Sequence, residues 1–182
     1  MRIVPTELPG VILVEPAVHG DHRGFFVEVF RGQWLHDLGI DGAFVQDNHS
    51  RSRRGVLRGL HYQLEHAQGK LVRAARGEIF DVAVDVRRGS PTFGRWFGAV
   101  LDDTSHRQMY VPPGFAHGFC VLSETADVIY KTTDYYHPAS ERGLLWNDPA
   151  IGIRWPISDV TLSPRDMANP HLADARPENL PA

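Results

Sequence analysis

Apolar and polar residues alternate along much of this chain, in short runs separated by turn residues. Segment 78–86 shows the pattern most clearly, because every second residue from Phe80 to Val86 is apolar, whereas Asp81 and Asp85 lie on the other face. A period of two is that of a β-strand with one buried face. The segment is therefore predicted to form a wall of the core.

Similar runs recur along the chain, separated by many of its 17 glycines and 13 prolines. Further strands are predicted at 11–14, 25–30, 43–48, 56–63, 69–75, 94–101, 108–111, 117–122 and 126–136. Many short strands joined by turns indicate a mainly β fold, and their spacing favours an antiparallel sandwich or jelly roll that closes its sheet edges.

Only two segments have helical character. One is 31–39, which stops at Gly39, and the other is a turn that begins at Ser163. In that turn serine is a suitable N-cap, proline follows at the first helical position and Asp166 at the third. The 182 residues are expected to form one domain, 1–182, with a peripheral tail after Asn169 that runs along the surface or frays.

Composition narrows the class of function. A net charge of −3 and a pI near 6.3 provide no basic surplus for nucleic-acid binding, so a small partner is expected. Cys120 is the single cysteine, which excludes an internal disulfide, and the N-terminus has no apolar run typical of a signal peptide. No apolar stretch approaches the roughly 18 residues of a spanning helix. We expect a cytoplasmic protein that is not integral to a membrane.

Polar residues cluster where the predicted strands should face inward. His61 and Gln63 share one strand face, Lys70 follows seven residues after Gln63, and His117 follows a Pro-Pro-Gly turn. Metal-binding cupins place two histidines as His-x-His, then a carboxylate, then a histidine after a Pro-x-Gly turn. Here Gln63 and Lys70 stand near two of those ligand positions, so no metal is expected. A fixed ammonium and imidazoles could instead stabilise negative charge that develops in a substrate.

Eight motifs, in order along the chain, resemble those of the dTDP-4-dehydrorhamnose 3,5-epimerases. They are DHRGFF (21–26), FVQDNHS (44–50), GVLRGLHYQ (55–63), QGKLVR (68–73), GSPTFG (89–94), VPPGFAHGF (111–119), YKTTDYY (130–136) and LSPRD (162–166). The resemblance implies a cupin-type barrel that needs no cofactor and inverts C3 and C5 of dTDP-4-dehydro-6-deoxy-D-glucose to give dTDP-4-dehydro-L-rhamnose, on the route to dTDP-L-rhamnose. It also implies a homodimer.

The resemblance further implies which residues carry the chemistry. A carbon beside a ketone loses its proton to form an enolate, so the reaction needs a base, a group that stabilises the oxyanion, and an acid on the opposite face. His61 is the implied base, with Asp166 orienting its imidazole, and Tyr130 is the implied proton donor. Lys70 is expected near the keto oxygen or the neighbouring phosphate. Asp166 has an alternative interpretation, in which it only caps the helix.

The remaining implied residues bind the nucleotide. The planar fork of arginine suits a diphosphate, and Tyr136, six residues after Tyr130 and so predicted on the same strand face, is expected to stack on thymine. The predicted binding residues are Arg23, Phe26, Glu28, Gln46, Asp47, Asn48, Arg58, Lys70, His117, Tyr136, Glu141 and Arg165.

Segment 25–30 carries two expectations. Phe26 and Glu28 share a mixed face that suits a ligand, whereas the opposite, apolar face is large enough to bury against a second copy of the chain.

Three other functions remain open from the sequence: an epimerase acting on one carbon, a 3,4-ketoisomerase, and a non-catalytic sugar-binding cupin. The last is disfavoured because a binding protein needs no acid opposite a base.

Overall fold

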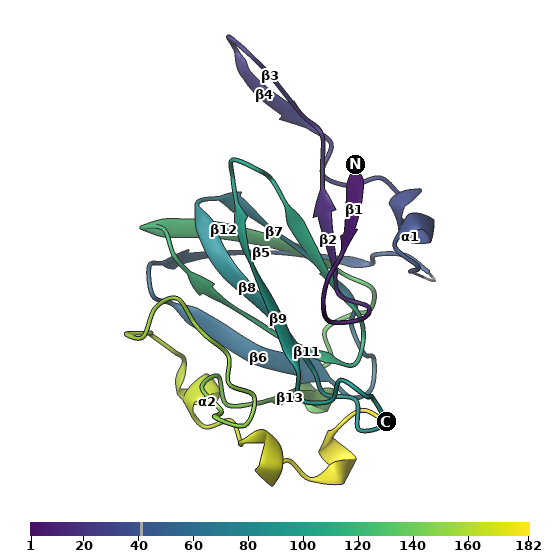
Figure 1. The fold of residues 1–182 in the computed structure, drawn as a ribbon, viewed down its shortest axis with the longest axis vertical. Coiled ribbons are helices and arrows are strands. Elements are labelled where there is room, and N and C mark those ends of the chain that lie inside the picture. Colours follow the sequence, from purple (N-terminus) through teal and green to yellow (C-terminus); the bar gives the residue numbers. More distant parts are fainter. Residues whose placement is uncertain (41) are drawn as a thin grey trace.

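Two antiparallel sheets, packed against each other, form the body of the protein in a computed structural model that describes residues 1–40 and 42–182 (Figure 1). The larger sheet has the order β1 (Arg2–Pro5), β2 (Ile12–Glu15), β10 (Gln108–Val111), β7 (Lys70–Arg76), β12 (Thr125–Thr132) and β5 (Gln46–Arg53). The smaller sheet has the order β13 (Glu141–Gly143), β6 (Leu57–Gln63), β11 (Phe115–Val121), β8 (Glu78–Asp85) and β9 (Trp96–Asp102). The predicted mainly β, jelly-roll class is confirmed.

A two-stranded hairpin, β3 (Val18–Asp21) and β4 (Gly24–Val27), projects away from this body (Figure 1). Helices are few and short. They are α1 (Trp34–Asp37), α2 (Pro164–Met167) and the 3-10 turns Pro138–Ser140, Leu172–Asp174 and Pro177–Asn179. None of the helices in the described part of the chain has the length and apolar character needed to cross a membrane.

The hydrophobic core occupies both sides of β8. Toward the larger sheet, Ile79 and Ala83 pack in one cluster with Val72 and Val128. The opposite face of β8, which carries Val82 and Val84, packs in a second cluster with Val86 just after the strand and with Leu60, Leu144, Ile151 and Leu180. The predicted core wall is therefore confirmed, and its polar face is buried as well, since Asp81 and Asp85 are both fully buried.

Several predicted strands have different ends in the structure. Strand 25–30 stops at Val27, and strand 43–48 begins only at Gln46 but continues to Arg53. The prediction that 126–136 is one strand was wrong, because β12 ends at Thr132, whose hydroxyl donates to the carbonyl of Asp134 at 2.8 Å and starts a turn.

Four short elements differ from the sequence analysis. Strands β1, β3 and β13 were not predicted, and they span only three or four residues each, too few for a clear alternation. Within 31–39, only four residues are helical, and Trp34 and Leu38 pack on the outer face of the larger sheet with Leu71 and Tyr110.

The tail after Asn169 follows the surface of the smaller sheet, one of its two predicted courses. Leu180 is buried there, the hydroxyl of Tyr62 donates to the carbonyl of Asn179 at 2.8 Å, and Arg142 donates to the Asn179 side chain at 2.9 Å. The tail thus covers the outer face of β6, while the inner face of β6 is left for the cavity.

Candidate active site

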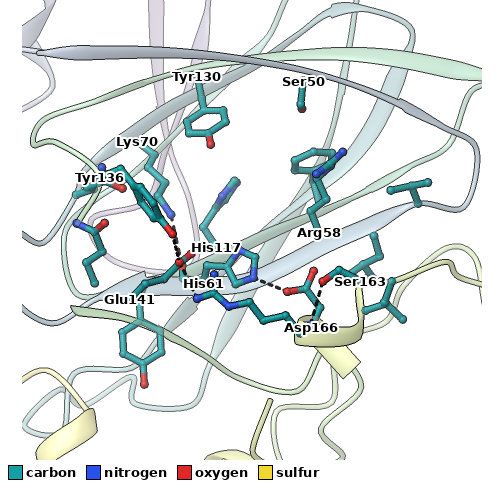
Figure 2. A pocket seen from close by; sticks show the side chains of 18 of the residues that line it. Ser50, Arg58, His61, Lys70, His117, Tyr130, Tyr136, Glu141, Ser163 and Asp166 are labelled. Carbon is teal, nitrogen blue, oxygen red and sulfur yellow. Dashed lines mark hydrogen bonds and ion pairs between the residues drawn. The ribbon is translucent and has the colours of Figure 1, made fainter. Parts of the chain in front are cut away.

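A cavity of about 480 Å³ opens between the two sheets (Figure 2). It is lined by residues of β5, β6, β7, β11, β12 and β13 and by the segment 161–166, which leads into α2. Nine of the fifteen predicted site residues line it: Arg58, His61, Lys70, His117, Tyr130, Tyr136, Glu141, Arg165 and Asp166.

His61 and Asp166 form a close pair on one wall of this cavity. The Nε2 atom of His61 lies 2.6 Å from Oδ1 of Asp166, and the Asp166 side chain is almost fully buried. Burial acts to raise the pKa of Asp166, but its bonds to His61, Ser163 and the Gly59 backbone outweigh burial and hold that pKa below the usual range. Asp166 is therefore an anion that can orient the imidazole and stabilise its protonated form.

Asp166 takes part in the helix cap and in the pair with His61 through different atoms. The backbone N–H of Asp166 donates to Oγ of the N-cap Ser163 at 3.1 Å, while the carboxylate is free to reach His61. The helix cap thereby fixes the carboxylate that holds the histidine.

The backbone of β6 is shaped so that His61 faces the cavity. Gly59 has φ +117°, and a Cβ at this position would lie 2.6 Å from Cα of Gly118 on β11. Glycine at both positions allows the strands to approach closely. In the resulting register His61 is the cross-strand partner of His117, so the two imidazoles line the same cavity.

Lys70 is buried beside the two histidines. Its Nζ atom donates to the carbonyl of His61 at 3.4 Å. Burial lowers the pKa of Lys70 to about 8, against the attraction of Glu141 and Asp81, which raises it. The side chain is therefore mainly an ammonium at pH 7, held in a place where negative charge on a bound molecule would be strongly stabilised.

Tyr130 belongs to β12 in the other sheet and points into the cavity from the side opposite His61 (Figure 2). Burial raises the pKa of its phenol, so the hydroxyl keeps its proton at neutral pH. An imidazole and a protonated phenol thus face each other across the cavity, in the arrangement of a base and an acid.

Tyr136, Glu141 and Arg165 meet at the open end of the cavity. The Tyr136 hydroxyl donates to Oε2 of Glu141 at 2.6 Å, and Arg165 forms an ion pair with the same oxygen at 2.6 Å. The bond to Glu141 raises the pKa of Tyr136. Tyr136 and Arg165 are about half exposed, whereas Lys70 is buried, which separates an outer from an inner part of the cavity.

Tyr136 reaches the cavity by a different route from the one predicted. It lies in the loop after β12, where its N–H donates to Oε1 of Gln46 at 2.9 Å. The Gln63 side chain donates to the carbonyl of Tyr135 at 3.3 Å and accepts from the N–H of His137 at 2.8 Å. Two glutamine side chains, and not a continuous strand, therefore place Tyr136.

Six of the predicted binding residues do not line the cavity of this chain. Arg23 and Phe26 lie on the projecting hairpin, and Glu28 lies just beyond it in an ion pair with Arg31. The side chain of Arg23 is 78% exposed and paired with Asp21. The idea that the mixed face of 25–30 forms a ligand wall is thus not supported within one chain, because the hairpin leaves the body.

The other three lie on β5. Asp47 points outward to Lys131, at 2.6 Å, and Gln46 donates to the Asn48 side chain at 3.0 Å. Gln46 still contributes indirectly through the loop that it holds.

The cavity also includes Gln63, which the sequence analysis placed on the same face as His61, and residues that it did not assign there: Ser50, Val56, Leu57, Tyr62, Gln68, Phe119, Thr161, Leu162 and Ser163. Ser50 continues the period of two from Gln46 and Asn48, so its position could have been deduced. The contribution of 161–163 could not, because a single parallel bridge between Val56 and Thr161 brings this segment to the start of β6.

Arg58 lies on the same wall as His61. Its guanidinium donates to Oγ of Ser52 at 3.1 and 3.2 Å, which fixes the planar fork at the edge of the cavity. Within residues 1–40 and 42–182 no group of three or more His, Cys, Asp or Glu side chains has the geometry to hold a metal ion.

Fold and cavity together define a cupin-like antiparallel barrel with an acid–base site between its sheets. Residues 5–174 match the family model described as dTDP-4-dehydrorhamnose 3,5-epimerase. The chain belongs to this family.

Relatives named dTDP-4-dehydrorhamnose 3,5-epimerase occur in several bacteria. The one from Pseudomonas aeruginosa is 56% identical over 177 residues, which cover 96% of this chain and 98% of the relative. The one from Neisseria gonorrhoeae is 57% identical over 176 residues, 96% of this chain, but this chain spans only about half of its length, 54%.

A crystal structure of dTDP-6-deoxy-D-glucose-3,5-epimerase from Legionella pneumophila, in complex with dTDP-4-keto-L-rhamnose, superimposes with a TM-score of 0.96. It is 52% identical, and the match covers 99% of this chain and 97% of that one.

The protonation of Lys70 can be measured directly, because Lys70 and Lys131 are the only two lysines in the sequence. In the free protein, ¹⁵N NMR of labelled lysine side chains should show Lys70 titrating near pH 8, with Lys131 as the internal reference. Glu141→Gln should lower the midpoint of Lys70, because it removes one of the two attracting carboxylates. A Lys70 midpoint at the ordinary lysine value, in wild type and variant alike, would contradict the described burial.

Proposed function

We propose that this protein inverts C3 and C5 of dTDP-4-dehydro-6-deoxy-D-glucose and so forms dTDP-4-dehydro-L-rhamnose. The observation that carries the proposal is the His61–Asp166 pair, which faces the protonated Tyr130 across the cavity. Inversion at a carbon requires a base on one face and an acid on the other, because the proton leaves one side of the ring and a proton returns on the opposite side. Family membership supports the same reaction.

His61 begins each inversion by taking the proton from the carbon beside the ketone. The electrons of the broken C–H bond form a carbon–carbon double bond, and the carbonyl oxygen becomes an enolate oxygen. Asp166 compensates the positive charge that His61 gains. Tyr130 then donates its proton to the other face of the carbon, and the carbonyl forms again.

The enolate oxygen needs a positive neighbour while the carbon is unprotonated. Lys70 provides a buried ammonium, and its position beside His61 and His117 suits the keto oxygen better than an outer phosphate. A preorganised charge in a cavity shielded from water stabilises such an intermediate without reorganisation.

The outer part of the cavity suits the nucleotide. Tyr136 provides a half-exposed ring for stacking on the base, and Arg58 and Arg165 provide forks for the diphosphate. Glu141 holds Tyr136 and Arg165 together at this end. Thymidine diphosphate would therefore lie toward solvent and the sugar toward Lys70.

We also propose that the protein is a homodimer. The hairpin exposes Phe25 and Phe26, at 61% and 70%, on an element that leaves the body of the chain. Arg23, predicted to bind substrate, lies on the same hairpin. Its predicted role and its position agree if the hairpin reaches the cavity of a second copy.

The dimer predicts a mass near twice 20.4 kDa in light scattering at micromolar concentration.

Arg23→Ala and His61→Ala should each lose activity alone. After subunit exchange, a mixture of the two variants should recover up to about a quarter of wild-type activity. About half of the dimers in an equal mixture are mixed, and one of the two sites in each mixed dimer combines an intact His61 with an intact Arg23 from the other subunit. A mass near 20.4 kDa would overturn the dimer, and a mixture that recovers nothing would overturn the shared site.

The reaction is tested by incubating the wild-type protein with the 4-keto sugar nucleotide in D₂O and following the proton NMR spectrum. The L-rhamno product with deuterium at both C3 and C5 is expected. Deuterium at one carbon would indicate a single-carbon epimerase, a shifted ketone a ketoisomerase, and an unchanged spectrum a binding protein.

Substitution of His61 and of Tyr130 should affect epimerisation and deuterium exchange differently in the same assay. His61→Ala should lose both epimerisation and deuterium exchange, by about 10²- to 10⁴-fold, because the enolate cannot form. Tyr130→Phe should lose most epimerisation yet keep measurable exchange, since His61 can return a solvent deuteron to the face it left. Tyr135→Phe is the matched control, because Tyr135 is exposed and does not line the cavity. If the Tyr130→Phe variant epimerised the substrate at the wild-type rate, another group would have to be the proton donor.

A further inference from the structure

A second histidine–carboxylate pair lies on the inner face of the smaller sheet, beside the cavity that His117 lines. The Nε2 atom of His117 lies 2.8 Å from Oδ1 of Asp81, and Asp81 is fully buried. Asp81 is on β8 and does not line the cavity, whereas His117 on the neighbouring β11 does. Any effect of Asp81 on a bound molecule must therefore pass through His117 or through charge.

The bonding of Asp81 is incomplete for a buried carboxylate. Its second oxygen, Oδ2, has no hydrogen-bond partner among residues 1–40 and 42–182. Asp85, four residues further on the same face of β8, is equally buried but receives bonds from Arg87, Ser90 and Thr92. A buried polar atom without a hydrogen-bond partner is uncommon in native proteins and calls for an explanation.

The positive groups near Asp81 explain why its charge is tolerated. Lys70 is attracted by Asp81, and its other attracting carboxylate is Glu141 on β13. His117, the cross-strand partner of His61, adds a ring that carries positive charge when protonated. Asp81 is thus bonded to His117 and attracts Lys70 through its charge, beside the place where the enolate oxygen would lie.

The pairing also fixes which nitrogen of His117 is available. The Asp81 carboxylate accepts a hydrogen bond from Nε2–H, and Nδ1 has no hydrogen-bond partner in the described part of the chain. A ring held by Nε2 has one orientation, so Nδ1 is held at a constant place relative to the cavity.

We propose that Asp81 is a positioning residue for the epimerisation: it holds His117 through Nε2 and supplies the negative charge that keeps His117 and Lys70 together as the site for the enolate oxygen. This inference rests on the epimerase function proposed above. Asp81 moves no proton itself, and it acts on the intermediate through His117 and Lys70.

The variant Asp81→Asn keeps the size of the side chain and removes its charge. It should lower kcat about 10- to 100-fold, with KM and dTDP affinity within about threefold of wild type, because the nucleotide contacts lie elsewhere. Deuterium exchange at C3 and C5 should fall with kcat. Asp85→Asn is the matched control: it removes the other buried carboxylate of β8 and should reduce thermal stability while leaving kcat unchanged.

A double-mutant cycle with His117→Asn tests whether Asp81 acts through this ring. Adding Asp81→Asn to His117→Asn should lower kcat by no more than about threefold further. The proposal would be overturned if the loss of kcat in the double variant equalled the product of the two single-variant losses. It would also be overturned if Asp81→Asn kept kcat within twofold of wild type.

A readout on the wild-type protein does not depend on any variant folding. The ¹⁵N shifts of the His117 ring should show a proton on Nε2, since a carboxylate accepts from that atom. An unprotonated Nε2 would overturn the positioning role of Asp81. If the wild-type protein showed no turnover, the proposed epimerase function would be wrong. The ¹⁵N shifts would still show whether His117 donates a hydrogen bond to Asp81.

Discussion

The hydrogen bond between His61 and Asp166 is the constraint on which the rest of the site depends. It joins β6 to α2 across 105 positions of sequence at 2.6 Å. The bond forms because Gly59 lets β6 approach β11 and because Ser163 caps the helix that carries the carboxylate. Without this pair the cavity would keep His117, two tyrosines, Lys70 and two arginines, but it would lose the imidazole and carboxylate that directly face Tyr130.

Charge is distributed unevenly around this pair. The inner part of the cavity holds Lys70 with buried carboxylates nearby, and the outer part holds Arg165 tied to Glu141. The ammonium of Lys70 is buried and would act strongly on a developing anion, whereas the guanidinium of Arg165 is about half exposed and suits a diphosphate that must enter and leave. In the proposed function, the buried part of the cavity serves the chemistry and the exposed part serves recognition of the nucleotide.

The sequence predicted the fold class, most strands, and nine residues that line the cavity. It succeeded where periodicity or a motif determines the position, as on β8 and around His61. The prediction failed where packing between distant parts of the chain determines the position of a residue. Tyr136 was placed on a strand that in fact ends at Thr132, and the face of 25–30 expected to form a ligand wall begins on a hairpin that leaves the body of the chain. Asp81 was recognised only as polar, because its hydrogen-bond partner His117 is 36 residues away in the sequence.

The central claim, that Asp166 makes His61 an effective base, is tested most directly by Asp166→Asn. The helix cap uses the backbone N–H of residue 166, so the substitution leaves the cap and removes only the charge beside His61. Steady-state turnover and C–H exchange in D₂O should both fall about 10²- to 10⁴-fold, with dTDP affinity unchanged. An Asp166→Asn protein that turns over and exchanges within threefold of wild type would contradict the account.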